Sequence, residues 1–124
     1  MIKRIVVAGC RDYENYEQAK AFIENCIKEI RKENTLVFMS GKCRGADALG
    51  EKYAKENGFD IEYYPAQWEK LGRAAGPIRN QKMAEVCDFV ICFWDGESRG
   101  TRSMIGYAKK LNKPIKVKRI KKHL

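Results

Sequence analysis

The chain has 124 residues, 44% of them hydrophobic, which is enough for one domain with a buried core and excludes a disordered chain. No apolar run approaches the roughly 20 residues that a membrane-spanning helix needs. Residues Met1–Arg4 lead directly into a strand-like apolar run and are too short for a signal peptide, so we expect a cytoplasmic protein without membrane contact.

The net charge of +9 is concentrated at the C-terminal end. Residues 98–124 hold 10 Lys and Arg and no Asp or Glu, whereas residues 1–97 hold 15 basic and 16 acidic residues. We therefore predict a nearly neutral domain, residues 1–115, followed by a basic tail, residues 116–124. Such a tail either contacts phosphate groups or keeps the protein soluble, and the sequence leaves both interpretations open.

The five cysteines are odd in number and form no Cys-x-x-Cys pair. This pattern favours reduced thiols over a disulfide framework or a zinc site. We interpret Cys10 and Cys43 as small buried residues, although arginines close to them would lower the pKa of a thiol. We expect no bound metal and no cofactor.

Five short apolar runs have the composition of buried parallel strands, and the segments between them show helical spacing of apolar residues. This alternation predicts an α/β fold, a single Rossmann-like three-layer sandwich around a mainly parallel five-stranded sheet. Right-handed crossovers then bring the loops that follow the strands to one edge of the sheet. The predicted strands are Arg4–Ala8, Leu36–Met39, Ile61–Tyr64, Phe89–Trp94 and Ile115–Val117, and the predicted helices include residues 46–57 and 77–86.

The loops after these strands are rich in arginine and glycine. Six of the nine arginines lie in them or in the helical turns that follow directly, while most lysines lie on helix faces and in the tail. A guanidinium group offers phosphate or carboxylate a planar fork of donors, so this segregation indicates an anionic ligand. Neither the Walker pattern nor Gly-x-Gly-x-x-Gly is present, which argues against P-loop hydrolysis and an ordinary dinucleotide site.

The segment Pro65–Met83 has the most unusual composition of these loops. We predict that Gly76 caps a helix that begins at the following proline, with Arg79 and Asn80 in its first turn. Free N–H groups at such a helix start would form an anion site. Trp68, in the same segment, either contacts a ligand or covers the core.

The last helix and two acidic residues complete the predicted site. Gly100 and Thr101 would offer N–H groups and a hydroxyl to a phosphate at the helix start. Asp47 and Asp95 are candidates for ribose contacts or for acid–base catalysis, although the helix dipole also favours an acid at position 47. The predicted ligand contacts are Gly9, Arg11, Gly41, Arg44, Gly45, Trp68, Arg73, Gly76, Arg79, Asn80, Gly100 and Thr101.

Taken together, these loops resemble the SLOG superfamily of Rossmann-like domains, which includes the DNA-processing protein DprA (Smf) and the LOG phosphoribohydrolases. The resemblance is strongest to the small YspA-like, YpsA-related branch, whose motifs follow strands one, two and three and open the last helix. The corresponding residues here are Gly9-Cys10-Arg11, residues 40–47, Pro65-Ala66-Gln67-Trp68, residues 72–80 and Gly100-Thr101.

The resemblance implies a nucleotide or a nucleotide-derived ligand at the edge that is rich in glycine and arginine. LOG enzymes cleave the base from a nucleoside 5′-monophosphate, and their last motif resembles Gly-Gly-x-Gly-Thr-x-x-Glu. Met104 occupies the position of that glutamate in this chain. A thioether cannot act as a carboxylate, so hydrolysis of an N-glycosidic bond would need another acid, either Asp47 or Asp95.

Two other function classes stay open. One is a single-stranded nucleic-acid binder of the DprA type, in which the basic tail holds phosphates and Trp68 stacks on bases. The other is a nucleotide sensor that binds its ligand without turnover and changes its assembly. Exposed apolar surface on so small a sheet favours a homo-oligomer.

Overall fold

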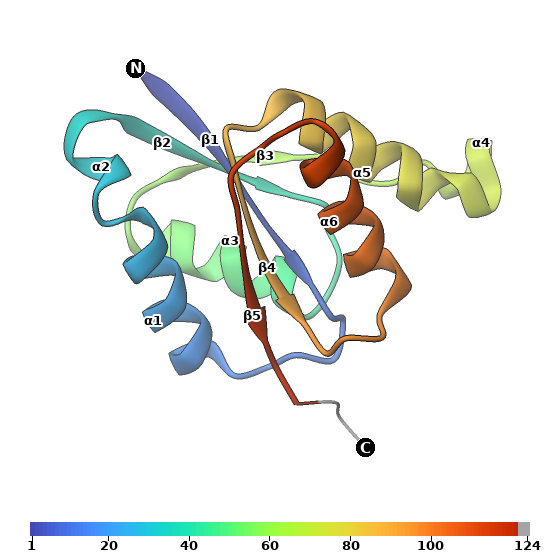
Figure 1. Ribbon diagram of the computed structural model, residues 1–124, viewed down its shortest axis with the longest axis horizontal. Helices are drawn as coiled ribbons and strands as arrows, with labels where there is room; N and C mark the ends of the chain where they lie inside the picture. The colour runs from blue at the N-terminus through green and yellow to red at the C-terminus, as the bar shows by residue number, and fades with distance from the viewer. Residues whose placement is uncertain (122–124) are drawn as a thin grey trace.

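The computed structural model describes residues 1–121, so the end of the predicted tail, residues 122–124, lies outside the described part of the chain. Figure 1 shows how the helices and strands follow one another. The elements are β1 (Ile2–Gly9), α1 (Tyr16–Ile27), α2 (Ile30–Glu33), β2 (Thr35–Ser40), α3 (Ala46–Glu56), β3 (Asp60–Tyr63), α4 (Trp68–Leu71), a 3₁₀ helix (Gly72–Ala74), α5 (Ala75–Val86), β4 (Phe89–Trp94), α6 (Arg99–Lys110) and β5 (Ile115–Arg119).

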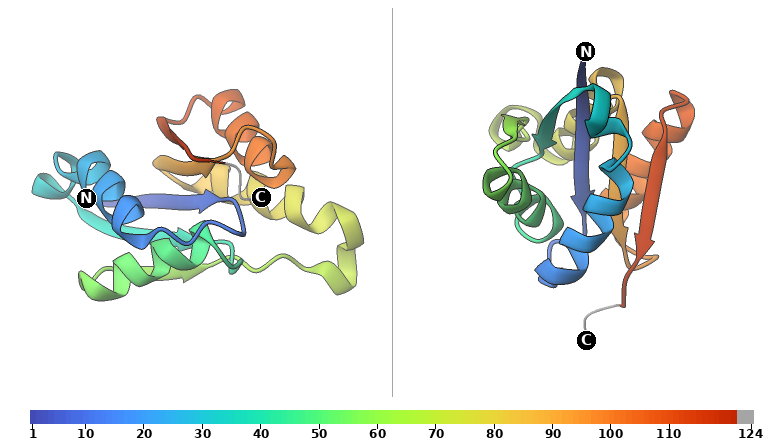
Figure 2. Two further views of the ribbon diagram at one scale, coloured as in Figure 1. Left: turned by 90° about the horizontal axis from the view of Figure 1, so that it is seen from below. Right: turned by 90° about the vertical axis from the view of Figure 1, so that its left-hand side faces the viewer.

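The five strands form one parallel sheet in the order β3-β2-β1-β4-β5. The chain builds the sheet outward from β1 to β3, then returns past β1 to add β4 and β5 on the other side (Figure 1). Helices cover both faces of the sheet (Figure 2), which confirms the predicted α/β fold and its Rossmann-like arrangement. Among residues 1–121, no helix is long and apolar enough to cross a membrane.

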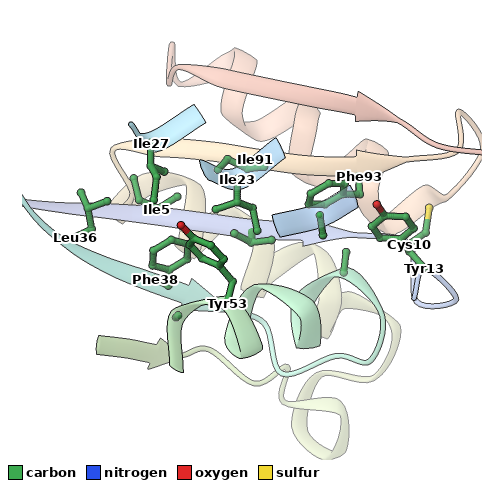
Figure 3. Close-up of a cluster of buried hydrophobic side chains, with 14 residues drawn as sticks. Ile5, Cys10, Tyr13, Ile23, Ile27, Leu36, Phe38, Tyr53, Ile91 and Phe93 are labelled. Atoms are coloured by element: carbon green, nitrogen blue, oxygen red, sulfur yellow. The ribbon is translucent and has the colours of Figure 1, made fainter. Parts of the chain in front are cut away.

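The central strand β1 separates two hydrophobic cores. Successive side chains of a strand point to opposite faces, so Ile5 and Val7 pack against helices α1 and α3 in the cluster of Figure 3. Val6 and Ala8 face the other side, where α5 and α6 cover them. Because both faces are buried, this strand is a continuous apolar run without alternation in the sequence.

The predicted strands are found within two residues of their expected ends, and the extension of β5 affects the predicted tail. It extends to Arg119, and its backbone pairs with β4 along its whole length, with Val117 opposite Cys92. Residues 116–119 therefore belong to the sheet, and the predicted start of the tail at residue 116 does not hold. Strand pairing uses backbone groups, and lysines are common on edge strands, so the basic composition did not prevent it.

The segment after β3 is more helical than the sequence indicated. It forms α4 and a 3₁₀ helix, which continues directly into α5 at Ala75. The prediction that Gly76 caps α5 is therefore wrong, because the chain is already helical before this residue. Gly76 is buried in the first turn, where a Cβ atom would lie 3.3 Å from the Trp68 ring. Arg79 and Asn80 consequently lie in the second turn of the helix.

Candidate functional site

A cavity of about 480 Å³ lies at the carboxyl ends of β1, β2 and β4. Here the strand order reverses, because the chain leaves β1 toward β2 on one side and places β4 on the other. Ligands of open α/β sheets bind at such a switch point. The cavity is lined by Ala8, Gly9, Cys10, Arg11, Asp12, Cys43, Arg44, Asp47, Arg79, Asn80, Met83, Asp95, Ser98, Gly100, Thr101 and Met104.

The loop after β1 is joined to the start of α3. The N–H of Ala46 donates a hydrogen bond of 3.1 Å to the carbonyl oxygen of Cys10. Gly45, the residue before α3, has a φ of +75°, and a Cβ atom there would lie 2.5 Å from the carbonyl oxygen of Arg11. Glycine is the residue that tolerates both this backbone conformation and this close approach.

Asp47 is a buried carboxylate in the first turn of α3, with only 5% of its surface exposed. Burial raises the pKa of Asp47 to about 6, while the guanidinium of Arg79 and the backbone N–H groups of Cys43 and Gly41 oppose that shift. Glu51, one turn further along α3, adds a like charge and acts in the same direction as burial. Asp47 therefore lines the cavity and changes its charge near pH 6.

Arg79 is held mainly by the protein itself. Its Nη1 donates to the carbonyl oxygen of Gly41 and, over 3.3 Å, to that of Tyr64. Its Nε donates to Oδ1 of Asn80 over 2.9 Å, and its Nη2 lies 3.7 Å from the sulfur of Cys43. The donors of this guanidinium, which was predicted to contact phosphate, are therefore used within the protein, and two of these contacts position the loop after β2.

The loop after β4 is organised around Asp95. Its Oδ1 accepts hydrogen bonds of 2.8 Å from the N–H groups of Glu97 and Ser98, and these bonds hold the pKa of Asp95 below its usual value. Ser98 then caps α6, because its Oγ accepts a hydrogen bond of 3.5 Å from the N–H of Thr101. Asp95 is therefore a charged group at neutral pH and shapes the loop in front of α6.

Arg11 and Arg44 are the exposed arginines of the cavity wall. The ion pairs found within residues 1–121 are Arg4–Glu62 and Lys32–Glu29, so neither of these two guanidinium groups is neutralised by one. They are therefore available to an anionic ligand. In the same part of the chain, no group of three or more His, Cys, Asp or Glu is placed to hold a metal ion.

The cavity brings together most of the predicted site residues. Gly41 and Gly45 do not line it, but each is packed closely against other residues. A Cβ atom at Gly41 would lie 2.8 Å from Oδ2 of Asp47. Trp68, Arg73 and Gly76 do not line the cavity. Trp68 lies on α4, where it is 50% exposed, and Arg73 is exposed on the 3₁₀ helix. The predicted residues that line the cavity are Gly9, Arg11, Arg44, Asp47, Arg79, Asn80, Asp95, Gly100 and Thr101.

Several lining residues were not assigned a ligand contact from the sequence. Cys10 and Cys43 both line the cavity, and burial raises the pKa of the Cys10 thiol, as expected for a small buried residue. Ser98 could have been found, because serine is a preferred helix cap and it stands three residues before Thr101. Met83 carries no local signal, because only the orientation of α5 against the sheet turns it toward the cavity.

Comparison with known proteins identifies the family of this domain. A model of the family described as the YspA, cpYpsA-related SLOG family (YAcAr) matches residues 3–71, which is more than half of the chain. The chain belongs to this family. The match includes the loops after β1 and β2, while the parts of the cavity on α5 and α6 lie outside it. The SLOG resemblance noted in the sequence is thereby confirmed.

Individual relatives match this chain over most of its length. The Gene 61 protein of Mycobacterium phage D29 is 28% identical over 120 residues, covering 92% of this chain and 94% of the phage protein. The structure of DNA processing protein A (DprA) from Streptococcus pneumoniae matches 94% of this chain with a TM-score of 0.66 and 21% identity, but the match covers only 50% of DprA. The structure of TM1055 matches 93% of this chain and 72% of TM1055, with a TM-score of 0.65 and 19% identity. At these identities the two structures establish a common fold.

Proposed function

We propose that this SLOG-family domain binds a nucleotide or a nucleotide-derived ligand in the cavity at the carboxyl edge of the sheet. The observation that carries the proposal is that two exposed guanidinium groups, Arg11 and Arg44, share one cavity with the buried carboxylate of Asp47. The volume of about 480 Å³ suits a ligand of nucleotide size. Guanidinium groups fit phosphate, and carboxylates fit ribose hydroxyls.

The phosphate would lie between these guanidinium groups and the first turn of α6. The first N–H groups of a helix have no acceptor within the helix, and they favour an anion. A Cβ atom at Gly100 would meet nothing within 4 Å, so the backbone of this turn is open to a ligand. The hydroxyl of Thr101 lies beside it in the cavity wall, 3.1 Å from the Ser98 hydroxyl.

The two carboxylates would divide the remaining roles. Asp95 stays charged and would accept hydrogen bonds from ribose hydroxyls. Asp47, with a pKa of about 6, would exchange a proton if the bound nucleotide is hydrolysed. In that reaction water adds to the anomeric carbon, the N-glycosidic bond breaks, and the base leaves with its electron pair and takes up a proton.

Because of Met104, we propose ligand binding as the function of the cavity and treat hydrolysis as a second question. Met104 is 1% exposed and lines the cavity, at the position where the LOG motif has a glutamate. A site that binds a nucleotide without turnover, coupled to a change of assembly, is therefore the alternative form of the same proposal. Base release measured by chromatography, together with the molecular mass in solution, separates the two forms.

Thermal unfolding of the full chain tests the binding itself. The panel would contain nucleoside monophosphates, cyclic nucleotides, dinucleotides, ADP-ribose and NAD. A ligand at about 100 times its dissociation constant adds roughly 2.7 kcal/mol to the free energy of unfolding, which raises the Tm of such a domain by several degrees. A shift with one of these small ligands supports the proposal, and a cooperative transition that none of them moves contradicts it.

A further inference from the structure

The surplus of positive charge lies at one edge of the sheet, on α6 and the edge strand β5. Helix α6 and strand β5 are packed together at one edge of the sheet (Figure 1) and form one side of the molecule (Figure 2). They belong to residues 98–124, which hold 10 basic and no acidic residues, whereas the rest of the chain is almost neutral. The charge asymmetry of the sequence is therefore an asymmetry of the protein surface.

The solvent-facing side of α6 carries four basic side chains around a glycine. A helix turns by about 100° per residue, so the residues of this side lie opposite the buried residues of the helix. They are all exposed, and a Cβ atom at the central Gly106 would meet nothing within 4 Å. The residues of this side are Arg99, Arg102, Gly106, Lys109 and Lys110.

Contacts with Trp94 hold two guanidinium groups at the end of this side. The guanidinium carbons of Arg102 and Arg119 each lie 5.8 Å from the centre of the Trp94 ring. The Nη2 of Arg102 also donates to the carbonyl oxygen of Gly96 over 3.5 Å. The two ion pairs found within residues 1–121, Arg4–Glu62 and Lys32–Glu29, lie elsewhere. Two like charges thus lie at the same aromatic ring.

We propose that the exposed basic side of α6, together with Arg119 of β5, binds the phosphate backbone of double-stranded DNA, separately from the nucleotide cavity. Cations on rigid elements bind such a polyanion by displacing its counterions, independently of base sequence. Positively charged proteins are attracted to nucleic acid over long distances, and concentration of the charge on one side also orients the encounter.

The duplex fits this side better than a single strand does. Binding of single strands depends on aromatic rings that stack on bases. The exposed large apolar residues on this side, within residues 1–121, are Leu111 and Val117, and neither is aromatic. The aromatic rings of Trp94 and Tyr107 are half-buried here, and that of Trp94 is already in contact with Arg102 and Arg119. Trp68, which the sequence suggested as a stacking residue, lies on α4, far from the C-terminal end of β5 in Figure 1.

The salt dependence of DNA binding tests this proposal. Fluorescence anisotropy would follow a labelled duplex of about 20 base pairs at several salt concentrations, because each phosphate contact contributes about 0.9 to the slope of log K against log salt. The double variant Lys109→Gln, Lys110→Gln removes two exposed charges from the C-terminal end of α6, and neither lysine lines the cavity. The slope should therefore become shallower by about two.

A matched pair of lysines provides the control. Lys28→Gln with Lys55→Gln removes the same charge from the C-terminal ends of α1 and α3, on the opposite face of the sheet. This variant should keep the slope of the wild type. Equal losses in the two variants, or no salt-dependent binding of the duplex by the wild-type chain, would overturn the proposal.

Two further measurements distinguish DNA binding at α6 from binding at α4 and from binding in the nucleotide cavity. Tighter binding of a single strand than of the duplex, lost in Trp68→Ala and retained in the Lys109 and Lys110 variant, would assign nucleic-acid binding to α4 and overturn the proposal. Binding of the small nucleotides should be equal in both lysine variants and the wild type, because none of the four lysines lines the cavity. The salt dependence of DNA binding thus tests the proposed DNA surface, and binding of small nucleotides tests the proposed cavity independently.

Discussion

The side-chain amide of Asn80 donates a hydrogen bond of 3.2 Å to the carbonyl oxygen of Gly100 and so connects α5 to the first turn of α6. The other end of the amide, Oδ1, accepts a hydrogen bond of 2.9 Å from Nε of Arg79. Arg79 in turn holds the loop after β2 through the carbonyl oxygen of Gly41. A single buried amide therefore links the part of the cavity formed by β2 with the part formed by α6.

Removal of this amide should loosen the cavity and lower stability. Asn80→Ala leaves the carbonyl of Gly100 and the Nε of Arg79 without these partners, which costs about 1–3 kcal/mol of unfolding free energy. Gln81→Ala, at an exposed position of the same helix, should change stability by no more than about 0.5 kcal/mol. Urea denaturation of both variants measures the difference, and similar small effects would show that the amide does not stabilise the fold.

The buried carboxylate of Asp47 should make stability depend on pH. Its pKa is about 6 in the folded protein, compared with 3.8 for an ordinary aspartate. A carboxyl whose pKa is raised by folding destabilises the folded state once it is charged. The free energy of unfolding therefore falls as pH rises from about 4 to 6. Asp47→Asn removes this effect and should gain on the order of 3 kcal/mol over the wild type above about pH 7, at 1.36 kcal/mol per pKa unit.

The gain from Asp47→Asn should disappear below about pH 4, where the wild-type carboxyl is protonated in both states. Denaturation curves of the wild type and the variant across this pH range give the comparison. Asp60→Asn removes an exposed carboxylate of β3 and controls for the loss of one charge. A constant difference at all pH values would mean that ionisation of Asp47 is not its cause.

Two glycines with similar φ values should respond differently to alanine. Gly45 and Gly58 have φ values of +75° and +73°, but only at Gly45 would a Cβ atom meet neighbouring backbone. Gly58→Ala should cost about 1–2 kcal/mol from backbone strain alone. Gly45→Ala should cost about 1–3 kcal/mol more, because its ψ of −130° lies in a region that few residues other than glycine adopt and because the loop after β1 must move. Thermal unfolding compares the two, and equal losses would exclude the contact as the cause.

The exposed arginines of the cavity should determine the affinity for a small nucleotide. A hydrogen bond to a charged group contributes about 1.5–3 kcal/mol, so Arg11→Ala and Arg44→Ala should each raise the Kd about tenfold to a hundredfold. Arg73→Ala lies outside the cavity and should leave the Kd unchanged. Calorimetric titration with the ligand found in the thermal screen measures all three, and an equal effect of Arg73→Ala would place the ligand elsewhere.

The fold class and much of the cavity wall could be predicted because they depend on local patterns. Apolar runs of strand length that alternate with helical stripes are enough to indicate a parallel sheet, and in such a sheet the loops after the strands share one edge. Arg11, Arg44 and Asp95 could therefore be predicted at one edge without knowledge of any long-range contact, and all three line the cavity there. Their positions follow directly from the strand that precedes each of them.

Only the tertiary structure decided what each group does at that edge. Arg79 and Arg44 are indistinguishable by type and by predicted location, yet Arg79 is bound to the carbonyl oxygens of Gly41 and Tyr64, which lie far from it in the sequence. The raised pKa of Asp47 arises in the same way, from burial among several elements. Sequence patterns reveal how a segment folds and which edge it reaches, but solvent exclusion and hydrogen-bond partners depend on which segments meet there.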